Sequence, residues 1–361
     1  MLKYVDAVIL MKVDRKKLKI LSENVLDFDG LLKISPLEVF DQDVIEFLDM
    51  LSKNIFKDKR AKEYPDVITF AFFCRKGNID HQKKQYNQDD FVRLGKGLAF
   101  HISPSNVPVN FAYSLVAGLL SGNTNIIRIP SKSFEQVEII IDAIKKISNS
   151  RVSDRVIIIS YDHESTNITE ELSALCDIRI IWGGDKTIND IRTSKLSPRT
   201  TDLTFADRYS ICLINADVLV EKGDFKDLVS GFYNDTYLFD QNACTSPHLV
   251  AWIGLKKNVS KAKALFWDHL NDFVHESYSL QNIQSIDKLT TFYSQSIANP
   301  NINLESFKDN FLWRVRLDSL EGDIEKFRCN GGYFLEIDLN NIQDLNSIIT
   351  KQYQTLAYYG F

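Results

Sequence analysis

The sequence lacks the charge excess that would suit a polyanionic partner. Its 361 residues include 43 lysines and arginines against 48 aspartates and glutamates, which gives a formal net charge of −5. Nucleic acid and anionic lipid attract proteins through accumulated positive charge. The basic clusters here, residues 15–19 and the pair Lys83 and Lys84, are short and typical of solvated surface. We therefore expect no nucleic-acid partner.

A long apolar run and a targeting signal are also lacking. The longest apolar stretch, residues 111–120, is interrupted by Gly118, whereas a helix that spans a bilayer needs about 20 apolar residues. Residues 5–14 read V-D-A-V-I-L-M-K-V-D, a strand-like run without a cleavage site. We expect neither a membrane span nor a secretory signal.

Cysteines and histidines form no disulfide or metal-binding pattern. The five cysteines lie far apart without a C-x-x-C pair, and the six histidines show no ligand spacing. An odd, scattered set of cysteines is typical of a reducing compartment. We expect a cytoplasmic protein without a disulfide framework and without a bound metal.

What the sequence does contain is a regular alternation of short apolar runs with helical patterns. Strands are expected at residues 98–102, 125–129, 156–159, 178–182 and 211–214, and helices at 109–120, from 133 onwards, at 169–176 and at 186–192. This alternation predicts an α/β fold with a doubly wound, Rossmann-type parallel sheet. Ser133 and Gln136 predict a capping box at the start of one helix.

Three polar segments follow expected strands and precede expected helices. They are S-P-S-N at 103–106, R-I-P-S-K-S at 128–133 and W-G-G-D at 182–185. Ligands of doubly wound sheets bind at the carboxyl ends of the strands. We therefore expect all three segments at one ligand-binding edge.

The remaining chain divides into an irregular beginning and a second α/β pattern. The first 90 residues mix short strands with polar helices, with helical spacing over 36–56. From residue 224 follow a helix ending at Phe239, a strand at 249–253 and an amphipathic helix at 260–274. We expect an N-terminal segment with a cofactor-binding domain over 1–223 and a catalytic domain over 224–361.

One cysteine stands apart from the others. Cys74, Cys176 and Cys212 have apolar neighbours and fit the core, where most cysteines lie. Cys244 lies instead in D-Q-N-A-C-T-S-P, residues 240–247, among small polar residues. The local sequence fits a nucleophile at the mouth of a cleft and a structural thiol equally well.

Other candidates are weaker when taken singly. Asn106, between two prolines, is either a turn residue or an oxyanion donor. Gly183 and Gly184 either cradle a phosphate at a helix start or form an ordinary turn. His248 follows Cys244 closely, but at the start of a strand it is more typical of a structural residue.

Together these segments are more specific. In order and spacing, I-S-P-S-N-V-P, G-N-T-N-I-I-R-I-P-S, W-G-G-D-K-T-I and D-Q-N-A-C-T-S-P resemble the aldehyde dehydrogenase superfamily. The residues of these segments are most similar to its acyl-CoA reductase branch, the family of the bacterial bioluminescence fatty-acid reductase subunit. Y-P-D-V-I-T-F-A-F-F-C-R-K-G-N-I at 64–79 and Y-Q-T-L at 353–356 resemble that branch too. The resemblance covers residues 64–361 and implies an aldehyde-dehydrogenase-like fold.

The resemblance also implies roles for individual residues. Cys244 matches the family nucleophile and Asn106 the oxyanion-binding asparagine. The adenosine side of the cofactor site is matched by Ser103, Pro104, Arg128 and Ser131. The turn beneath the pyrophosphate is matched by Gly183, Gly184 and Asp185.

The position matched by Arg128 borders the adenosine ribose, and Lys132 lies four residues further on. A guanidinium pairs well with a 2′-phosphate and gains little from a 2′-hydroxyl. We therefore expect NADPH in preference to NADH. The alternative is that Arg128 and Lys132 are solvated surface charges.

A missing glutamate bears on the reaction. Aldehyde dehydrogenases that hydrolyse their thioester carry a glutamate base before the strand at 211–214, whereas here no glutamate occurs between Glu171 and Glu221. Asp207 stays open as an alternative base at an offset position. We expect NADPH-dependent reduction of an acyl-CoA or acyl-protein thioester to the aldehyde. The alternatives are a CoA-acylating aldehyde dehydrogenase that acts on a short aldehyde, and a non-catalytic truncated subunit.

The end of the chain departs from the family pattern. Members of this branch usually continue well past Y-Q-T-L, with a tail that completes the cofactor lobe and builds the oligomer, whereas this sequence stops at Phe361. We expect the tail to be absent or shortened, through truncation, a split gene or a short branch. The resemblance implies acyl-CoA, an acyl carrier or an acyl-loaded synthetase as partner, and leaves a homo-oligomer open.

Overall fold

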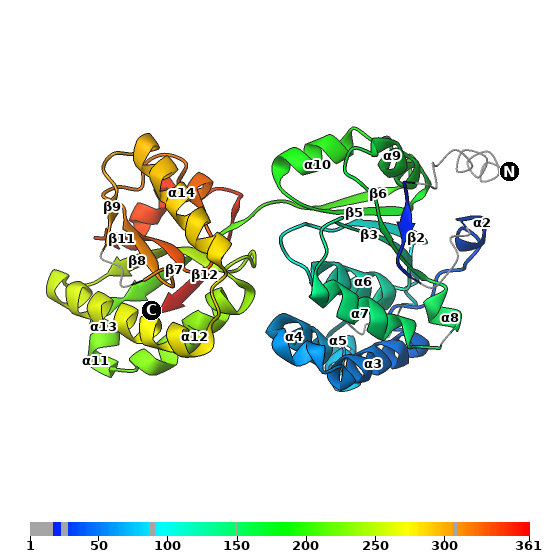
Figure 1. Cartoon of the computed structure of the whole chain (residues 1–361), viewed down its shortest axis with the longest axis horizontal. Coiled ribbons are helices and arrows are strands. Elements are labelled where there is room, and N and C mark those ends of the chain that lie inside the picture. The colour runs from blue at the N-terminus through cyan, green and yellow to red at the C-terminus, as the bar shows by residue number, and fades with distance from the viewer. Residues whose placement is uncertain (1–16, 23–27, 87–90, 149, 306–308) are drawn as a thin grey trace. The chain divides into compact units, whose positions relative to one another are not determined.

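The computed structural model describes residues 17–22, 28–86, 91–148, 150–305 and 309–361. The strand-like run at residues 5–14 lies outside the described residues. The chain divides into two compact units, Met1–Ala206 and Asp207–Phe361 (Figure 1). This division falls earlier than the boundary expected after residue 223. The reason is that the strand Tyr209–Asn215 pairs with strands of the second unit.

The described residues of the first unit form a six-stranded sheet in the order β1-β4-β3-β2-β5-β6. Its strands are β1 (Lys19–Ile20), β2 (Leu98–Ile102), β3 (Thr124–Ile129), β4 (Val156–Ser160), β5 (Ile178–Trp182) and β6 (Thr201–Phe205). Neighbours run parallel except β1, which is antiparallel to β4. Every residue of β2 and β4 is buried, because helices cover both faces of the sheet. The expected doubly wound sheet is confirmed.

Helices of the first unit pack in two layers (Figure 1). One layer contains α3 (Gln42–Lys57), α4 (Pro65–Phe73), α5 (Lys76–Tyr86), α6 (Asn110–Leu120), α7 (Glu135–Lys145) and α8 (Ser150–Ser153). The opposite layer contains α9 (Thr166–Leu175) and α10 (Asp185–Arg192). Two short elements complete the unit, α2 (Phe28–Leu31) and the 3-10 turn η2 (Arg60–Glu63).

Two local predictions in this unit need correction, one in where its helix starts and one in its cap. The helix expected over 36–56 begins at Gln42, where the Asp41 side chain accepts a hydrogen bond from the Asp43 N–H, and α3 is amphipathic rather than polar. The capping box expected at Ser133 does not form. Helix α7 begins after Phe134 without a side-chain cap, and the Ser133 hydroxyl donates to the Glu138 carboxylate, 3.0 Å away.

The strand order creates a switch point. From β2 the chain adds β3 and β4 on one side, then returns to add β5 and β6 on the other side. The loops after β2 and β5 therefore diverge at the carboxyl edge of the sheet, where such folds bind ligands. The segments S-P-S-N and W-G-G-D flank this point, as the sequence predicts.

The described residues of the second unit form another six-stranded sheet, in the order β12-β7-β8-β11-β10-β9. Its strands are β7 (Tyr209–Asn215), β8 (Pro247–Ile253), β9 (Asn303–Leu304), β10 (Trp313–Arg316), β11 (Tyr333–Leu339) and β12 (Tyr353–Tyr359). All neighbours run parallel except β9, which is antiparallel to β10. One buried cluster lies on each face of the sheet.

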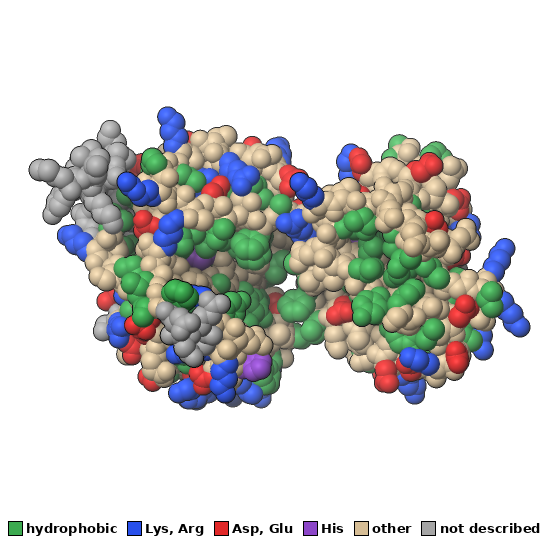
Figure 2. All heavy atoms as spheres, turned by 180° about the vertical axis from the view of Figure 1, so that it is seen from behind, with side chains coloured by type: hydrophobic (Ala, Val, Ile, Leu, Met, Phe, Trp, Pro, Cys, Tyr) green, Lys and Arg blue, Asp and Glu red, His purple; other side chains and the backbone are tan. Residues whose placement is uncertain are grey.

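The helices of the second unit are α11 (Ala216–Lys222), α12 (Phe225–Thr236), α13 (Lys256–Ser277) and α14 (Asn282–Ala298), with the 3-10 turns η3 (Tyr237–Phe239), η4 (Ile324–Phe327) and η5 (Ile342–Ser347). Helix α13 contains the amphipathic stretch expected at 260–274. No helix among the described residues has both the length and the apolar character needed to cross a bilayer. Acidic and basic side chains are interspersed over the face shown in Figure 2, in keeping with the small net charge.

Candidate functional site

The loop after β2 carries Ser103, Pro104 and Asn106. The Ser103 N–H donates to the Arg128 carbonyl oxygen, 3.1 Å away, which extends the pairing of β2 with β3. Its hydroxyl oxygen is buried and has no hydrogen-bond partner, whereas Asn106 is exposed. Ser103, Pro104 and Lys132 line one small hollow between the loops that follow β2 and β3. A buried hydroxyl without a partner at a strand end is a feature that a polar ligand would satisfy.

The end of β3 carries a half-buried arginine. The Arg128 guanidinium lies 5.1 Å from the centre of the Tyr161 ring, and its Nη2 donates weakly to the Tyr161 carbonyl oxygen, 3.4 Å away. Its Nε is buried without a hydrogen-bond partner among the described residues. Its charge is therefore available to an anion.

Two further cofactor candidates lie nearby. The Ser131 hydroxyl approaches the Tyr161 carbonyl oxygen at 3.5 Å and the Asp162 carboxylate at 3.3 Å. The exposed Lys132 ammonium lies 4.8 Å from the centre of the Phe134 ring. Arg128 and Ser131 thus converge on the Tyr161 carbonyl.

The turn after β5 is open above a helix start. The Gly183 N–H donates to the Phe205 carbonyl oxygen at 3.2 Å, and Gly184 is the N-terminal cap of α10. A Cβ atom at Gly184 would meet no atom within 4 Å, so nothing in the chain itself fills the space there. The backbone N–H groups that begin a helix, Asp185 included, attract anionic groups. The turn is therefore suited to a phosphate.

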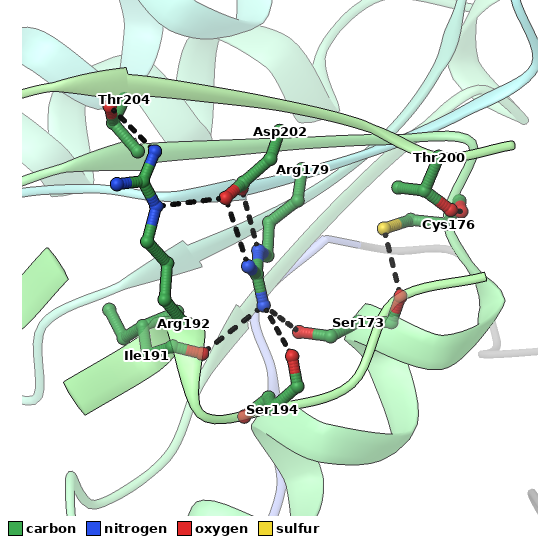
Figure 3. A network of polar contacts seen from close by, with 9 residues as sticks. All are labelled: Ser173, Cys176, Arg179, Ile191, Arg192, Ser194, Thr200, Asp202 and Thr204. Carbon is green, nitrogen blue, oxygen red and sulfur yellow. Dashed lines mark hydrogen bonds and ion pairs between the residues drawn. The ribbon is translucent and has the colours of Figure 1, made fainter. Parts of the chain in front are cut away.

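A buried arginine braces this strand and helix from the opposite edge of the sheet (Figure 3). Arg179, at the start of β5, pairs with Asp202 of β6 through two bonds of 2.9 and 3.1 Å. Its Nη1 also donates to the carbonyl oxygens of Ile191, in the last turn of α10, and Ser194, which follows the helix. Sequence reasoning missed this network, because a single arginine within an apolar strand carries no local signal of its partners.

In the second unit, Cys244 differs from the other thiols. It is exposed, whereas the four other cysteines are buried. Burial raises the pKa of the Cys176 and Cys212 thiols to about 12 and also raises the pKa of Cys74 and Cys329. Thiolate is the reactive form of cysteine, so Cys244 is the thiol of this chain best placed to react.

A buried glutamine holds the turn that carries Cys244. The Gln241 amide donates to the carbonyl oxygens of Pro247 and Tyr333, both 3.0 Å away. Its side-chain oxygen accepts from the N–H groups of Gly332 and Tyr333, at 3.0 and 3.1 Å. All four hydrogen-bonding positions of the amide are therefore used.

The backbone of this turn is unusual. Asp240 and Gln241 have φ values of 52° and 59°, in the left-handed region that non-glycine residues rarely adopt. The Ser246 hydroxyl donates to the Asp235 carbonyl oxygen at 2.7 Å. These bonds and those of Gln241 keep the strained turn in one conformation, as is common at functional sites.

Two residues from neighbouring strands contact Cys244 directly. The Ser210 hydroxyl, at the start of β7, donates to the Cys244 carbonyl oxygen at 2.7 Å. The Gln354 amide, at the start of β12, donates to the Cys244 sulfur at 3.6 Å. Cys244 therefore lies at the amino edge of the second sheet. Sequence reasoning did not assign roles to Ser210, Gln241 or Gln354, although Y-Q-T-L was among the segments that resemble the family.

His248 and Asp207 have other partners. His248 is buried, which lowers its pKa to about 3, and its ring centre lies 5.6 Å from that of Tyr209. Asp207 forms an ion pair of 2.8 Å with Arg328. Asn106 belongs to the first unit and Cys244 to the second, so their joint action stays a prediction.

Comparison with known proteins adds to this geometry. A family model described as acyl-CoA reductase (LuxC) matches residues 77–262, just over half of the chain. The chain belongs to this acyl-CoA reductase family. The matched segment includes both the strand-end loops of the first unit and the Cys244 turn of the second.

Curated relatives of the family are longer proteins. The chain is similar to the long-chain acyl-protein thioester reductase of Vibrio harveyi, with 30% identity over 171 residues, which cover 46% of this chain and 34% of that protein. It is also similar to the protein of that name from Photorhabdus laumondii subsp. laumondii, with 24% identity over 182 residues, 50% of this chain and 36% of the relative. The match spans about a third of the length of these relatives.

Solved structures show which fold the family member adopts. Lactaldehyde dehydrogenase from Escherichia coli matches with a TM-score of 0.60 at 11% identity, covering 88% of this chain and 78% of that chain. PnpE in complex with nicotinamide adenine dinucleotide matches with a TM-score of 0.63 at 10% identity, covering 92% and 75%. The aldehyde-dehydrogenase-like fold expected from the sequence is confirmed.

Proposed function

We propose that this member of the family reduces an activated fatty-acyl thioester to the aldehyde, with NADPH as reductant and Cys244 as the acyl carrier. One observation supports this most directly. The exposed thiol, Cys244, lies in a strained turn held by a fully bonded buried glutamine, inside the segment that the family model matches. The relatives named above are acyl-protein thioester reductases, which favours an acyl-protein donor over free acyl-CoA.

The first step transfers the acyl group. The Cys244 thiolate attacks the carbonyl carbon of the donor thioester, and the carbonyl electron pair moves to oxygen. The Asn106 amide and the Cys244 backbone N–H hold that oxyanion. The carbon–sulfur bond to the donor then breaks, the donor leaves as a thiolate that takes up a proton, and Cys244 keeps the acyl group.

A bound nicotinamide supplies the hydride that reduces this acyl group to the level of an aldehyde. Cys244 then leaves as a thiolate, and the aldehyde carbonyl reforms. The two candidate bases for activating water are absent or paired, because no glutamate lies between residues 171 and 221 and Asp207 forms an ion pair with Arg328. The acyl group therefore waits on Cys244 for reduction rather than hydrolysis.

The residues of the first unit suit the cofactor. The unpartnered Ser103 hydroxyl and Arg128 Nε offer polar contacts, and Arg128 offers a charge to a 2′-phosphate. The open space over Gly184 leaves room for a pyrophosphate at the start of α10. Ser103, Pro104, Arg128, Ser131 and Lys132 would hold the adenosine side.

Acyl capture tests the proposal directly. After mixing with an acyl-CoA or a thioesterified acyl-protein, intact mass should show one added acyl group that persists until NADPH is supplied. Addition of NADPH should then release aldehyde. Cys244→Ser should lose both capture and reduction without loss of fold, because serine is close in size but has no anion at neutral pH.

Two results would contradict this function. Rapid release of free fatty acid would mean that another base activates water. Equal acylation of all five cysteines would favour a non-catalytic subunit.

The five free thiols fit a reducing compartment, and we propose a cytoplasmic site of action on that ground.

A further inference from the structure

Two irregularities in strand pairing flank the beginning of β7. Between β12 and β7 the register passes from Tyr353 opposite Tyr209 to Thr355 opposite Ser210, which leaves Gln354 as an extra residue. Between β8 and β7 it passes from Pro247 opposite Ser210 to Leu249 opposite Ile211, which leaves His248 as an extra residue. Such bulges re-aim a side chain and are common beside functional sites.

The bulge on β12 directs Gln354 to the candidate nucleophile. Its side-chain amide donates to the Cys244 sulfur at 3.6 Å, across 110 residues of sequence. Hydrogen bonds to sulfur are longer than those to oxygen, because sulfur is the larger atom. The Cys244 carbonyl oxygen is held from the same edge by Ser210. The turn, the neighbouring strand and the bulged residue thus meet at Cys244.

Other groups that often stabilise a thiolate are engaged elsewhere. His248 is buried and its pKa is lowered to about 3, so its ring is neutral near pH 7 and supplies no positive charge. The Arg328 guanidinium is paired with Asp207 at 2.8 Å and also donates to the Arg208 carbonyl oxygen. Among the described residues, Gln354 provides the side-chain donor that contacts the Cys244 sulfur.

We propose that Gln354 is a catalytic residue whose amide N–H stabilises the Cys244 thiolate. This role rests on the proposed function of Cys244 as the acyl carrier. The thiol proton passes to solvent, and the amide N–H faces the resulting negative charge. When Cys244 attacks the acyl donor its charge is lost, and when the aldehyde departs the charge returns.

The balance of effects favours a faster reaction near neutral pH. A stabilised thiolate is a weaker nucleophile. The logarithm of its rate constant falls, however, by only about 0.4–0.5 for each unit by which the pKa of a thiol falls. For any thiol whose pKa lies above the pH, the gain in thiolate fraction is therefore larger than the loss in reactivity. The same bond makes Cys244 a better leaving group when the aldehyde is released.

Alkylation by iodoacetamide tests this without any acyl donor. Cys244 is the exposed thiol, so peptide mapping assigns its rate in the full chain between pH 6 and 10. We expect Gln354→Ala to slow alkylation at pH 7 by about three- to tenfold, since a hydrogen bond to a charged group is lost at an exposed site. The pH range over which the alkylation rate rises should lie higher for Gln354→Ala than for the wild-type chain.

Gln354→Glu separates electrostatics from packing. Glutamate keeps the size of glutamine but replaces the donor with a negative charge, so alkylation at pH 7 should be slower than in Gln354→Ala. A residue that merely fills space would leave Gln354→Glu equal to the wild-type chain. Gln352→Ala, two residues earlier in the same segment, is the matched control and should alkylate at the wild-type rate.

The outcomes are distinct. Equal pH profiles for the wild-type chain, Gln354→Ala and Gln354→Glu would overturn the role of Gln354, even if the wild-type chain captures an acyl group. If the wild-type chain captures no acyl group but Gln354→Ala still shifts the alkylation profile, the proposed function fails, whereas the bond between Gln354 and Cys244 stands. A changed circular dichroism spectrum would identify a variant that misfolds, and Gln354→Asn would then replace it.

Discussion

The two units present their candidate groups at different edges of similar sheets. In the first unit the loops lie at the carboxyl ends of β2, β3 and β5, next to the start of a helix. In the second unit the Cys244 turn precedes β8 and meets the amino ends of β7 and β12. A helix start offers unpaired N–H groups to a ligand, whereas the Cys244 turn offers an exposed thiol.

The two units also differ in what holds their candidate groups in place. In the first unit, Gly184 leaves open space and Ser103 has an unpartnered hydroxyl, so the loops themselves leave room for a ligand. In the second unit, the side chains of Gln241, Ser210 and Gln354 form hydrogen bonds that hold the Cys244 turn. We therefore expect substitutions at the first-unit site to affect cofactor binding or the rate of aldehyde formation. Substitutions around the Cys244 turn should lower the free energy of unfolding as well.

The largest expected effect is on turnover and comes from the first unit. Asn106 is exposed, so Asn106→Ala should leave folding unchanged. Loss of an oxyanion donor should lower the rate of aldehyde formation by about 10²–10³-fold while acyl-donor binding is retained. Steady-state kinetics would check this, and a rate within a few-fold of wild type would exclude Asn106 from the oxyanion site.

The second unit should respond through stability. Gln241→Ala leaves buried backbone groups of Gly332, Tyr333 and Pro247 without partners, which should cost about 3 kcal/mol of the free energy of unfolding. Three of the four tryptophans, Trp252, Trp267 and Trp313, belong to this unit, so their fluorescence follows its unfolding in urea.

The control for this prediction is Gln343→Ala, because Gln343 is exposed. It should unfold at the wild-type urea concentration. An unchanged midpoint for Gln241→Ala would mean that the turn does not depend on the buried amide.

Acid should destabilise both units through one buried histidine each. Burial lowers the pKa of His101 to about 4 and that of His248 to about 3, below the 6.5 of an unfolded histidine. The unfolded chain therefore binds more protons below pH 6.5, and stability falls as the pH drops from 6.5 towards these values. At pH 5 each histidine should cost about 2 kcal/mol.

Variants can assign this pH dependence. His248→Gln does not titrate, so the tryptophan signal of the second unit should lose much of its dependence on pH between 6.5 and 5. His163→Gln, at an exposed position of the first unit, should leave the dependence unchanged. If His248→Gln retains the full wild-type slope, other groups cause the acid sensitivity.

The smallest effect is expected in cofactor choice. Arg128→Ala should weaken NADPH binding by about tenfold and NADH binding far less, because the charged pair with a 2′-phosphate is lost. Titration with each nicotinamide, followed by fluorescence, would measure both. Equal weakening of the two would place Arg128 away from the 2′-phosphate.

Much of the first unit could be predicted from its sequence. The strands at 98–102 and 178–182 have the predicted limits, because short apolar runs between polar turns mark strands of a covered sheet; every residue of the first is buried, and alternate residues of the second are. The division of the chain was harder to predict. The strand at 209–215 resembles its predecessors in sequence, yet it pairs with β8 and β12.

By itself, the sequence determined the doubly wound sheet, the edge of the first unit at which the candidate cofactor loops lie, and Cys244 as the unusual cysteine. These follow from local patterns of apolar and polar residues. Only the tertiary structure decided that Gln241 holds the turn, that Ser210 and Gln354 contact Cys244, and that His248 is buried and neutral. These facts depend on strand register, and a bulge between strands more than a hundred residues apart leaves no local pattern, because one extra residue changes which side chains meet.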